Sequence, residues 1–123
     1  MRSFLFIAIW LCAGWGLSAQ SEQLAKNFFD QGEYEKSLKI YQELYKSNPA
    51  NSVYFNGVVS ANQQLENFQE AEDLLMERLN RSSNNPSILI ELGHNYELQN
   101  KEIQANRLYD EALQSIEARP NYA

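Results

Sequence analysis

The fold is decided by residues 24–49, which read LAKNFFDQGEYEKSLKIYQELYKSNP. In the second half of this stretch, apolar residues recur at spacings of three and four, at Leu38, Tyr41, Leu44 and Tyr45. That periodicity is typical of an amphipathic α-helix. Gly32 interrupts the pattern and suits the left-handed residue that ends a helix, and Pro49 closes the second helix. The stretch therefore predicts a pair of helices, over about residues 21–30 and 33–47.

The same pattern returns twice along the chain with a period of 34 residues. A column of small residues contains Ser37, Ala71 and Ala105. A column of large apolar residues follows four positions later and contains Tyr41, Leu75 and Tyr109. Three further columns keep the period: Leu24, Val58 and Leu92; Ala25, Val59 and Gly93; Tyr45, Leu79 and Leu113. Because one helix pair cannot bury its apolar face alone, we expect the three pairs to stack around one core.

The later copies predict further helices over about residues 52–65, 68–81 and 102–118. Another helix is expected to start at Pro86, which suits a first helical turn, and to break near Asn100. Asn67, with Glu70 three residues later, is typical of a capping box at the start of a helix. No stretch alternates as a β-strand would. The sequence therefore predicts an all-α protein of three helix-turn-helix repeats, over about residues 21–49, 52–85 and 86–120.

Individual residues of these units match the tetratricopeptide repeat family, and the chain resembles that family over essentially residues 21–120. The match in the first helix of a unit rests on Leu24, Ala25, Phe28, Leu92, Gly93 and Tyr96. The match in the turn and the second helix rests on Gly32, Tyr34, Pro49, Ala71, Leu75, Ala105 and Tyr109. Val59 and Asn62 depart from the family's pattern in the second copy. The resemblance implies three units stacked as a right-handed α-α superhelix, whose first helices line a groove.

Carried onto this sequence residue by residue, the resemblance places eight side chains in that groove: Lys26, Phe29, Asn56, Ser60, Gln63, Ile90, His94 and Glu97. Glu22 occupies a further groove position. Such mixed side chains suit an extended peptide or a helix of a partner protein. The carboxylate clamp of some family members is not expected here, because Glu22 and Glu91 stand near the positions where cations would be needed.

The first nineteen residues are predicted to be a secretory signal peptide. Arg2 gives a positive start, an apolar run follows from Phe4 to Leu17, and Ala19 precedes the expected cut before Gln20. A helix of that run is about 21 Å long, shorter than the roughly 30 Å hydrocarbon core of a bilayer, so a retained anchor is the weaker interpretation. The repeat domain is then residues 20–123, and we expect an exported, periplasmic or secreted protein.

Cysteine and charge exclude several classes of function. The single cysteine, Cys12, lies in the predicted signal peptide behind Trp10 and Leu11, which do not form a lipoprotein signal. The chain has 10 basic and 16 acidic residues, a net charge of −6 that becomes −7 without Arg2. Because that charge repels phosphate backbones and anionic headgroups, nucleic acid and membrane surfaces are poor partner candidates.

No constellation of catalytic or metal-binding residues emerges from the sequence. His94 is the only histidine, and with Glu91 and Glu97 it supplies too few ligands for a zinc site. A serine nucleophile would depend on that same histidine as its base, and there is no glycine-rich phosphate loop. We therefore expect no enzymatic activity and no cofactor.

The sequence as a whole favours a protein-interaction scaffold or adaptor of the bacterial envelope. The alternative is an N-terminal structural section of a longer repeat or multidomain protein, with no ligand of its own. Self-association, or contact with further repeats, stays open because the last helix has a broad apolar face, formed by Ile103, Ala105, Leu108, Tyr109, Ala112, Leu113 and Ile116.

Export is predicted to remove residues 1–19. Both tryptophans, Trp10 and Trp15, lie in this segment, so the mature protein should show tyrosine fluorescence only. The intact mass of the exported protein is the decisive measurement, and a mass that retains residues 1–19 would contradict the prediction.

Overall fold

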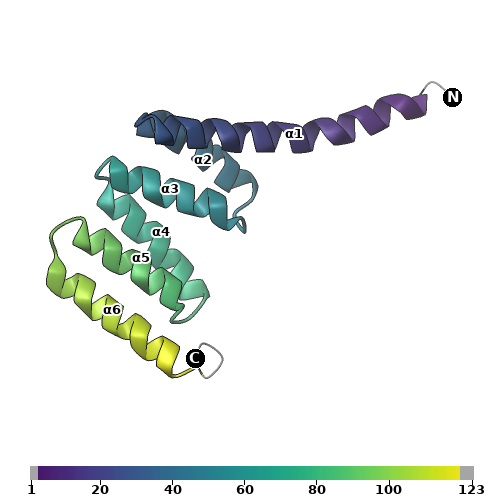
Figure 1. Cartoon of the computed structure of the whole chain (residues 1–123). Helices are drawn as coiled ribbons and strands as arrows, with labels where there is room; N and C mark the ends of the chain where they lie inside the picture. The colour runs from purple at the N-terminus through teal and green to yellow at the C-terminus, as the bar shows by residue number, and fades with distance from the viewer. Residues whose placement is uncertain (1–2, 120–123) are drawn as a thin grey trace. The chain divides into compact units, whose positions relative to one another are not determined.

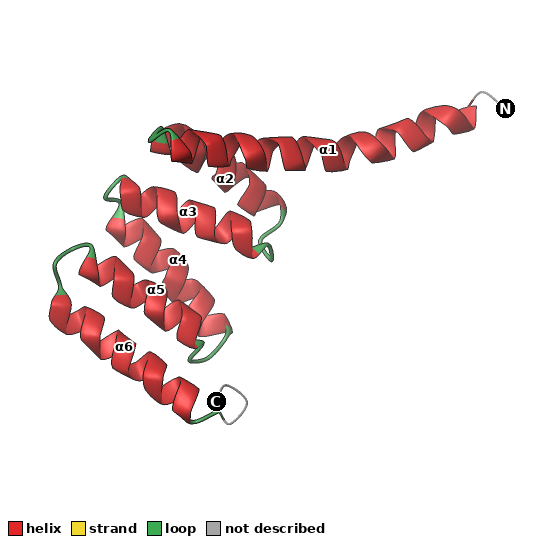
Figure 2. Ribbon diagram, viewed as in Figure 1, coloured by secondary structure: helices red, strands yellow, loops and turns green. Residues whose placement is uncertain are grey.

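The computed structural model describes residues 3–119, and the side chains of residues 16–119. Arg2 and the predicted end of the third unit at residue 120 lie outside the described residues. Within the described range the chain forms six helices and no strand, which confirms the all-α prediction (Figure 1 and Figure 2). The helices are α1 (Ser3–Asp30), α2 (Tyr34–Ser47), α3 (Ser52–Gln64), α4 (Phe68–Arg81), α5 (Pro86–Glu97) and α6 (Glu102–Glu117).

Four of the six helices start and end within a residue or two of the predicted positions. α5 starts at Pro86 as predicted and ends at Glu97, three residues before the predicted break near Asn100. The largest difference is in α1. This helix was expected to begin near residue 21, but it begins at Ser3 and runs 28 residues to Asp30. The prediction of its start was wrong because the apolar run and the repeat were treated as separate segments. Nothing between them breaks a helix: residues 17–21 contain neither proline nor glycine.

The turn within each helix pair repeats with the same geometry. Its residue with a positive φ is Gly32 (φ 78°), Glu66 (φ 60°) and Asn100 (φ 59°) in the three pairs. The next residue donates its backbone N–H to a carbonyl five positions back, from Glu33 to Phe28 (2.8 Å), Asn67 to Asn62 (2.8 Å) and Lys101 to Tyr96 (3.0 Å). These bonds form the Schellman motif, which satisfies carbonyl groups that a helix end would leave unpaired. The period of 34 residues is therefore a period of backbone conformation as well as of side chains.

The predicted capping box at Asn67 is not formed. Asn67 does precede α4, but its side chain makes no hydrogen bond to the helix N-terminus. Its Nδ2 instead donates to Oδ1 of Asn62 across the turn, at 3.3 Å. Asn85 provides the side-chain cap of α5, where its Oδ1 accepts the Ser87 N–H at 3.0 Å and Pro86 fills the first position.

The described helices belong to two compact units, the first ending at Ala61 and the second beginning at Asn62. In the first unit, α2 packs on the C-terminal part of α1. The Ser37 hydroxyl donates to the carbonyl oxygen of Ala25 at 2.8 Å, and both residues are fully buried. A small residue at position 37 thus permits close approach of the two helices, and its hydroxyl adds a buried hydrogen bond between them.

A glycine on one helix lies close against a tyrosine ring on a neighbouring helix in each unit. A Cβ atom on Gly93 of α5 would lie 2.5 Å from Cε1 of Tyr109 on α6. In the first unit, a Cβ atom on Gly57 of α3 would lie 2.5 Å from the ring of Tyr41 on α2. Both distances are shorter than a van der Waals contact, so only glycine fits at either position without a shift of the ring.

Gly93→Ala is predicted to destabilise the protein. Alanine normally stabilises a helix interior by about 1 kcal/mol relative to glycine, but here its methyl group would overlap the Tyr109 ring, and overpacking typically costs about 1–3 kcal/mol. Urea denaturation gives the difference in free energy of unfolding. In a Tyr109→Leu background the same substitution should be neutral or stabilising, since the second repeat combines Leu75 with the larger Val59 at these two columns. A Gly93→Ala variant at least as stable as wild type would contradict the contact.

Candidate functional site

The first unit contains an open pocket of about 620 Å³. Its walls come from the C-terminal part of α1 and from α3, and Tyr41 of α2 also lines it. Four of the eight predicted groove residues line this pocket together, namely Lys26, Phe29, Asn56 and Ser60, and Glu22 joins them. A pocket of this volume lies in the size range of ordinary ligand sites.

Tyr41 gives the pocket a buried aromatic surface. Its side chain is only 7 % exposed, and Gly57 of α3 brings the helix backbone close against its ring. Burial raises the pKa of the Tyr41 hydroxyl, and the Glu22 carboxylate raises it further. Val53 is about half exposed and also lines the pocket, so apolar area is available to a ligand.

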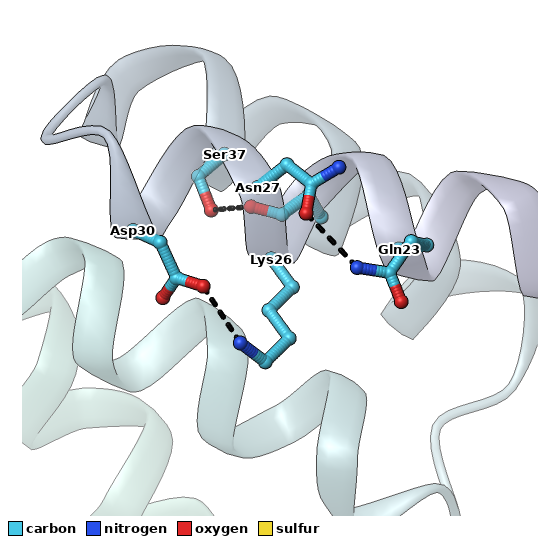
Figure 3. A network of polar contacts seen from close by, with 6 residues as sticks. Gln23, Lys26, Asn27, Asp30 and Ser37 are labelled. Carbon is cyan, nitrogen blue, oxygen red and sulfur yellow. Dashed lines mark hydrogen bonds and ion pairs between the residues drawn. The ribbon is translucent and has the colours of Figure 1, made fainter.

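One ion pair lies on the α1 wall of the pocket. Nζ of Lys26 is 2.6 Å from Oδ2 of Asp30, one helical turn further on. Figure 3 shows the two side chains directed toward each other, while Gln23 donates separately to Asn27 at 2.9 Å. The hydrogen bond and the charge of Asp30 raise the pKa of the Lys26 ammonium group. Asp30 therefore neutralises the one cation that the resemblance placed in the pocket.

Among the side chains that the structure describes, no cation lies within ion-pair distance of the Glu22 carboxylate. Glu22 is half-buried at the pocket. With Lys26 paired to Asp30, the ionised groups that line the pocket are two carboxylates and one ammonium. The pocket consequently carries a net negative charge next to an aromatic surface.

Three of the four predicted groove residues of the second unit lie on α5. Ile90 is 44 % exposed, and His94 and Glu97 are also exposed. Nδ1 of His94 is 3.6 Å from Oε2 of Glu97, and the Tyr109 hydroxyl donates to that same oxygen at 2.9 Å. Desolvation raises the pKa of Tyr109, and the carboxylates of Glu97 and Glu91 raise it further. These residues form an exposed face of α5 that is apolar at one end and acidic at the other.

Gln63 differs from the other predicted groove residues because it is buried. It is 7 % exposed, and its Nε2 donates to Oδ1 of Asn95 at 3.4 Å. Asn95 is fully buried and donates in turn to the Phe68 carbonyl at 3.0 Å. The expectation that Gln63 lines an open groove is therefore corrected: its amide belongs to a buried network that links α3, α5 and the start of α4.

Several pocket residues were not predicted from the sequence: Gln23, Asp30, Tyr41, Val53 and Gly57. A signal existed for Asp30, which stands four residues after Lys26, the spacing at which opposite charges pair on a helix. Tyr41 was assigned to the core because of its period. It belongs to the core and the pocket together, and periodicity alone does not reveal such a double role.

The part of the chain that the structure describes contains neither a metal-binding cluster nor a membrane-spanning helix. Among the side chains of residues 16–119, no three His, Cys, Asp or Glu residues come close enough to hold a metal ion. Among the described helices, none combines the length and the apolar character needed to cross a bilayer.

A short hydrogen bond joins α4 to α5 in the second unit. The Tyr96 hydroxyl donates to Oε1 of Glu72 at 2.6 Å. This bond, with desolvation and the carboxylate charge, raises the pKa of Tyr96 from 10.0 to about 12. Asn95 and Tyr96 thus tie the two helices together with neighbouring side chains, one bonded to backbone and one to a carboxylate.

Residues 20–120 match the family model described as the coatomer epsilon subunit. The chain belongs to the coatomer epsilon subunit family. The match includes parts of both compact units. No curated protein matches the sequence of this family member.

Solved structures share the fold of this coatomer epsilon family member. PcrH from Pseudomonas aeruginosa, in complex with the chaperone-binding region of PopB, is 19 % identical with a TM-score of 0.66, over 87 % of this chain and 86 % of that one. The translocator chaperone SycD of Yersinia enterocolitica is 20 % identical with a TM-score of 0.66, over 85 % and 80 %. The first tetratricopeptide domain of Spaghetti (RPAP3), bound to an HSP90 peptide, is 20 % identical with a TM-score of 0.62, over 79 % and 77 %. These likenesses confirm a tetratricopeptide-like helical-repeat fold.

Glu72→Gln is predicted to lower the pKa of Tyr96 from about 12 toward 10.0, because it removes the largest cause of the shift. Because folding raises the pKa of Tyr96, the protonated hydroxyl stabilises the native state at pH values below the unfolded pKa of 10.0. This stabilisation is lost as the pH rises from 10.0 to about 12. The difference in stability between wild type and variant should shrink over that range. NMR titration of ¹³C-labelled tyrosine gives the pKa. Asp73→Asn, with the same charge change one residue along α4, is the control, and an equal effect of both substitutions would contradict the bond.

Proposed function

We propose that this protein is an interaction module that binds a peptide or a helix of a partner protein in the pocket lined by α1, Tyr41 and α3. The observation that carries the proposal is the convergence of Lys26, Phe29, Asn56 and Ser60 on one open pocket. Aromatic surface provides affinity there, and amide, hydroxyl and charged groups provide hydrogen bonds that orient a ligand.

The fold supports the same function. PcrH is described in complex with a region of PopB, and the Spaghetti domain with an HSP90 peptide. Helical repeats of this type present many side chains along a concave surface, which suits segments rather than small substrates. We further propose that the partner is met in the bacterial envelope after export, because residues 1–19 have the layout of a signal peptide. Enzymatic activity is not part of the proposal.

A second candidate function is structural, in which the chain forms a section of a longer repeat assembly. The observation that favours it is exposed apolar area on α6, where Ile103 is 77 % exposed and Leu113 is 55 % exposed. Exposed apolar residues on a helix of a repeat array suit contact with a further repeat, a second copy of the chain or a partner. The two candidates use different helices, so they can be tested separately.

Peptide selection tests the first proposal. Random peptides displayed on phage are selected on the purified protein, and the enriched sequences are measured by fluorescence anisotropy. Asn56→Trp should fill the pocket and weaken binding about tenfold or more, because bulk at the centre of a contact excludes the ligand. Asn106→Trp, on the exposed surface of α6, is the matched control and should bind as wild type does.

Two results would contradict the proposal. One is that no peptide is enriched above background. The other is that enriched peptides bind Asn56→Trp and Asn106→Trp equally well, which would move the binding surface away from the pocket.

A further inference from the structure

We propose that the pocket of the first unit recognises a basic segment of its partner, with a lysine or arginine side chain lying along Tyr41 and its charge beside Glu22. This inference rests on the proposed function and adds the chemistry of the partner. It differs from the carboxylate recognition that a groove with free cations would provide.

The pocket carries one uncompensated negative charge. Lys26 is held by Asp30 at 2.6 Å, so its charge is already compensated. Glu22 is half-buried and lacks an ion-pair partner among the side chains of residues 16–119. A carboxylate in this position is stabilised by an incoming ammonium or guanidinium group, whereas an incoming carboxylate would be repelled by the uncompensated charge of Glu22.

The surface of the pocket beside the Glu22 carboxylate is apolar. Tyr41, Phe29 and Val53 line the pocket with apolar atoms. Lysine and arginine carry three or four methylene groups below their charge, and these stems pack well on apolar surface while the charged end reaches a polar group. The Glu22 carboxylate acts on the Tyr41 hydroxyl, which places the acidic group and the aromatic surface within electrostatic range of each other.

The second unit repeats this combination of apolar and acidic side chains. The exposed face of α5 combines Ile90 with Glu91, His94 and Glu97, again an apolar residue beside carboxylates. The chain as a whole has a net charge of −6. Electrostatic complementarity of this kind selects partners by sign and accelerates their association. A basic, partly apolar segment is therefore the occupant that the charges of both units favour.

Three synthetic peptides of twelve residues test the inference. They share one apolar framework and differ only at four positions, which are all lysine, all glutamine or all glutamate. Isothermal titration calorimetry should show that the lysine peptide binds at least tenfold more tightly than the glutamine peptide, with the glutamate peptide weakest. The preference should decrease as salt is raised from about 50 to 500 mM, because ions screen the contact.

Variants locate the effect in the pocket. Glu22→Gln should reduce binding of the lysine peptide about tenfold, and Lys26→Gln should strengthen it because a cation is removed. Glu35→Gln, which makes the same charge change at an exposed position of α2 outside the pocket, should leave affinity unchanged. Equal binding of the lysine and glutamine peptides would overturn this inference while the interaction function stands. Equal effects of Glu22→Gln and Glu35→Gln would overturn it as well, and failure of all three peptides to bind would count against both proposals.

Discussion

Close approach of neighbouring helices over a small residue is the constraint on which the rest of the structure depends. Gly93 admits the Tyr109 ring in the second unit, and Gly57 admits the Tyr41 ring in the first. At Ser37 the approach is close enough for a hydroxyl to reach the Ala25 carbonyl of the next helix. Helices held at this distance bury their large residues against one another, and dispersion and the hydrophobic effect then stabilise the pair.

The candidate site follows from the same packing. Tyr41 lines the pocket because Gly57 lets α3 come near its ring. On α1, the lining residues Glu22 and Phe29 lie about one helical turn before and after the buried Ala25. The proposed ligand surface is thus built on helices rather than on loops. Its charge has a different origin, since Lys26 and Asp30 are exposed, Glu22 is half-buried, and none of the three belongs to the buried core. Partner chemistry can therefore change in such a protein without loss of the fold.

Periodicity predicted the helices and the small-residue column, because both depend on spacing along the chain. It predicted the left-handed turn residue only at Gly32. Glu66 and Asn100 adopt the same conformation because the Schellman hydrogen bonds outweigh the strain of a non-glycine residue with positive φ. The burial of Gln63 was missed for a similar reason. Its partner, Asn95, is 32 residues away, and only tertiary structure brings the two amides together. The bond of Asn67 to Asn62 in place of a helix cap likewise depends on the turn geometry.

The close approach of neighbouring helices is tested most directly by the contacts of Gly93 and Gly57 with their tyrosine rings. In ¹³C-edited NOESY spectra of the purified protein, the Hα protons of Gly93 should show cross-peaks to the Tyr109 ring, and those of Gly57 to the Tyr41 ring. The ring currents should also shift both pairs of protons upfield. Gly32 should show neither effect, because apart from its two chain neighbours no residue comes within 4 Å of its Cβ position. Absence of these cross-peaks in a folded, helical protein would contradict the helix register and the pocket built on it.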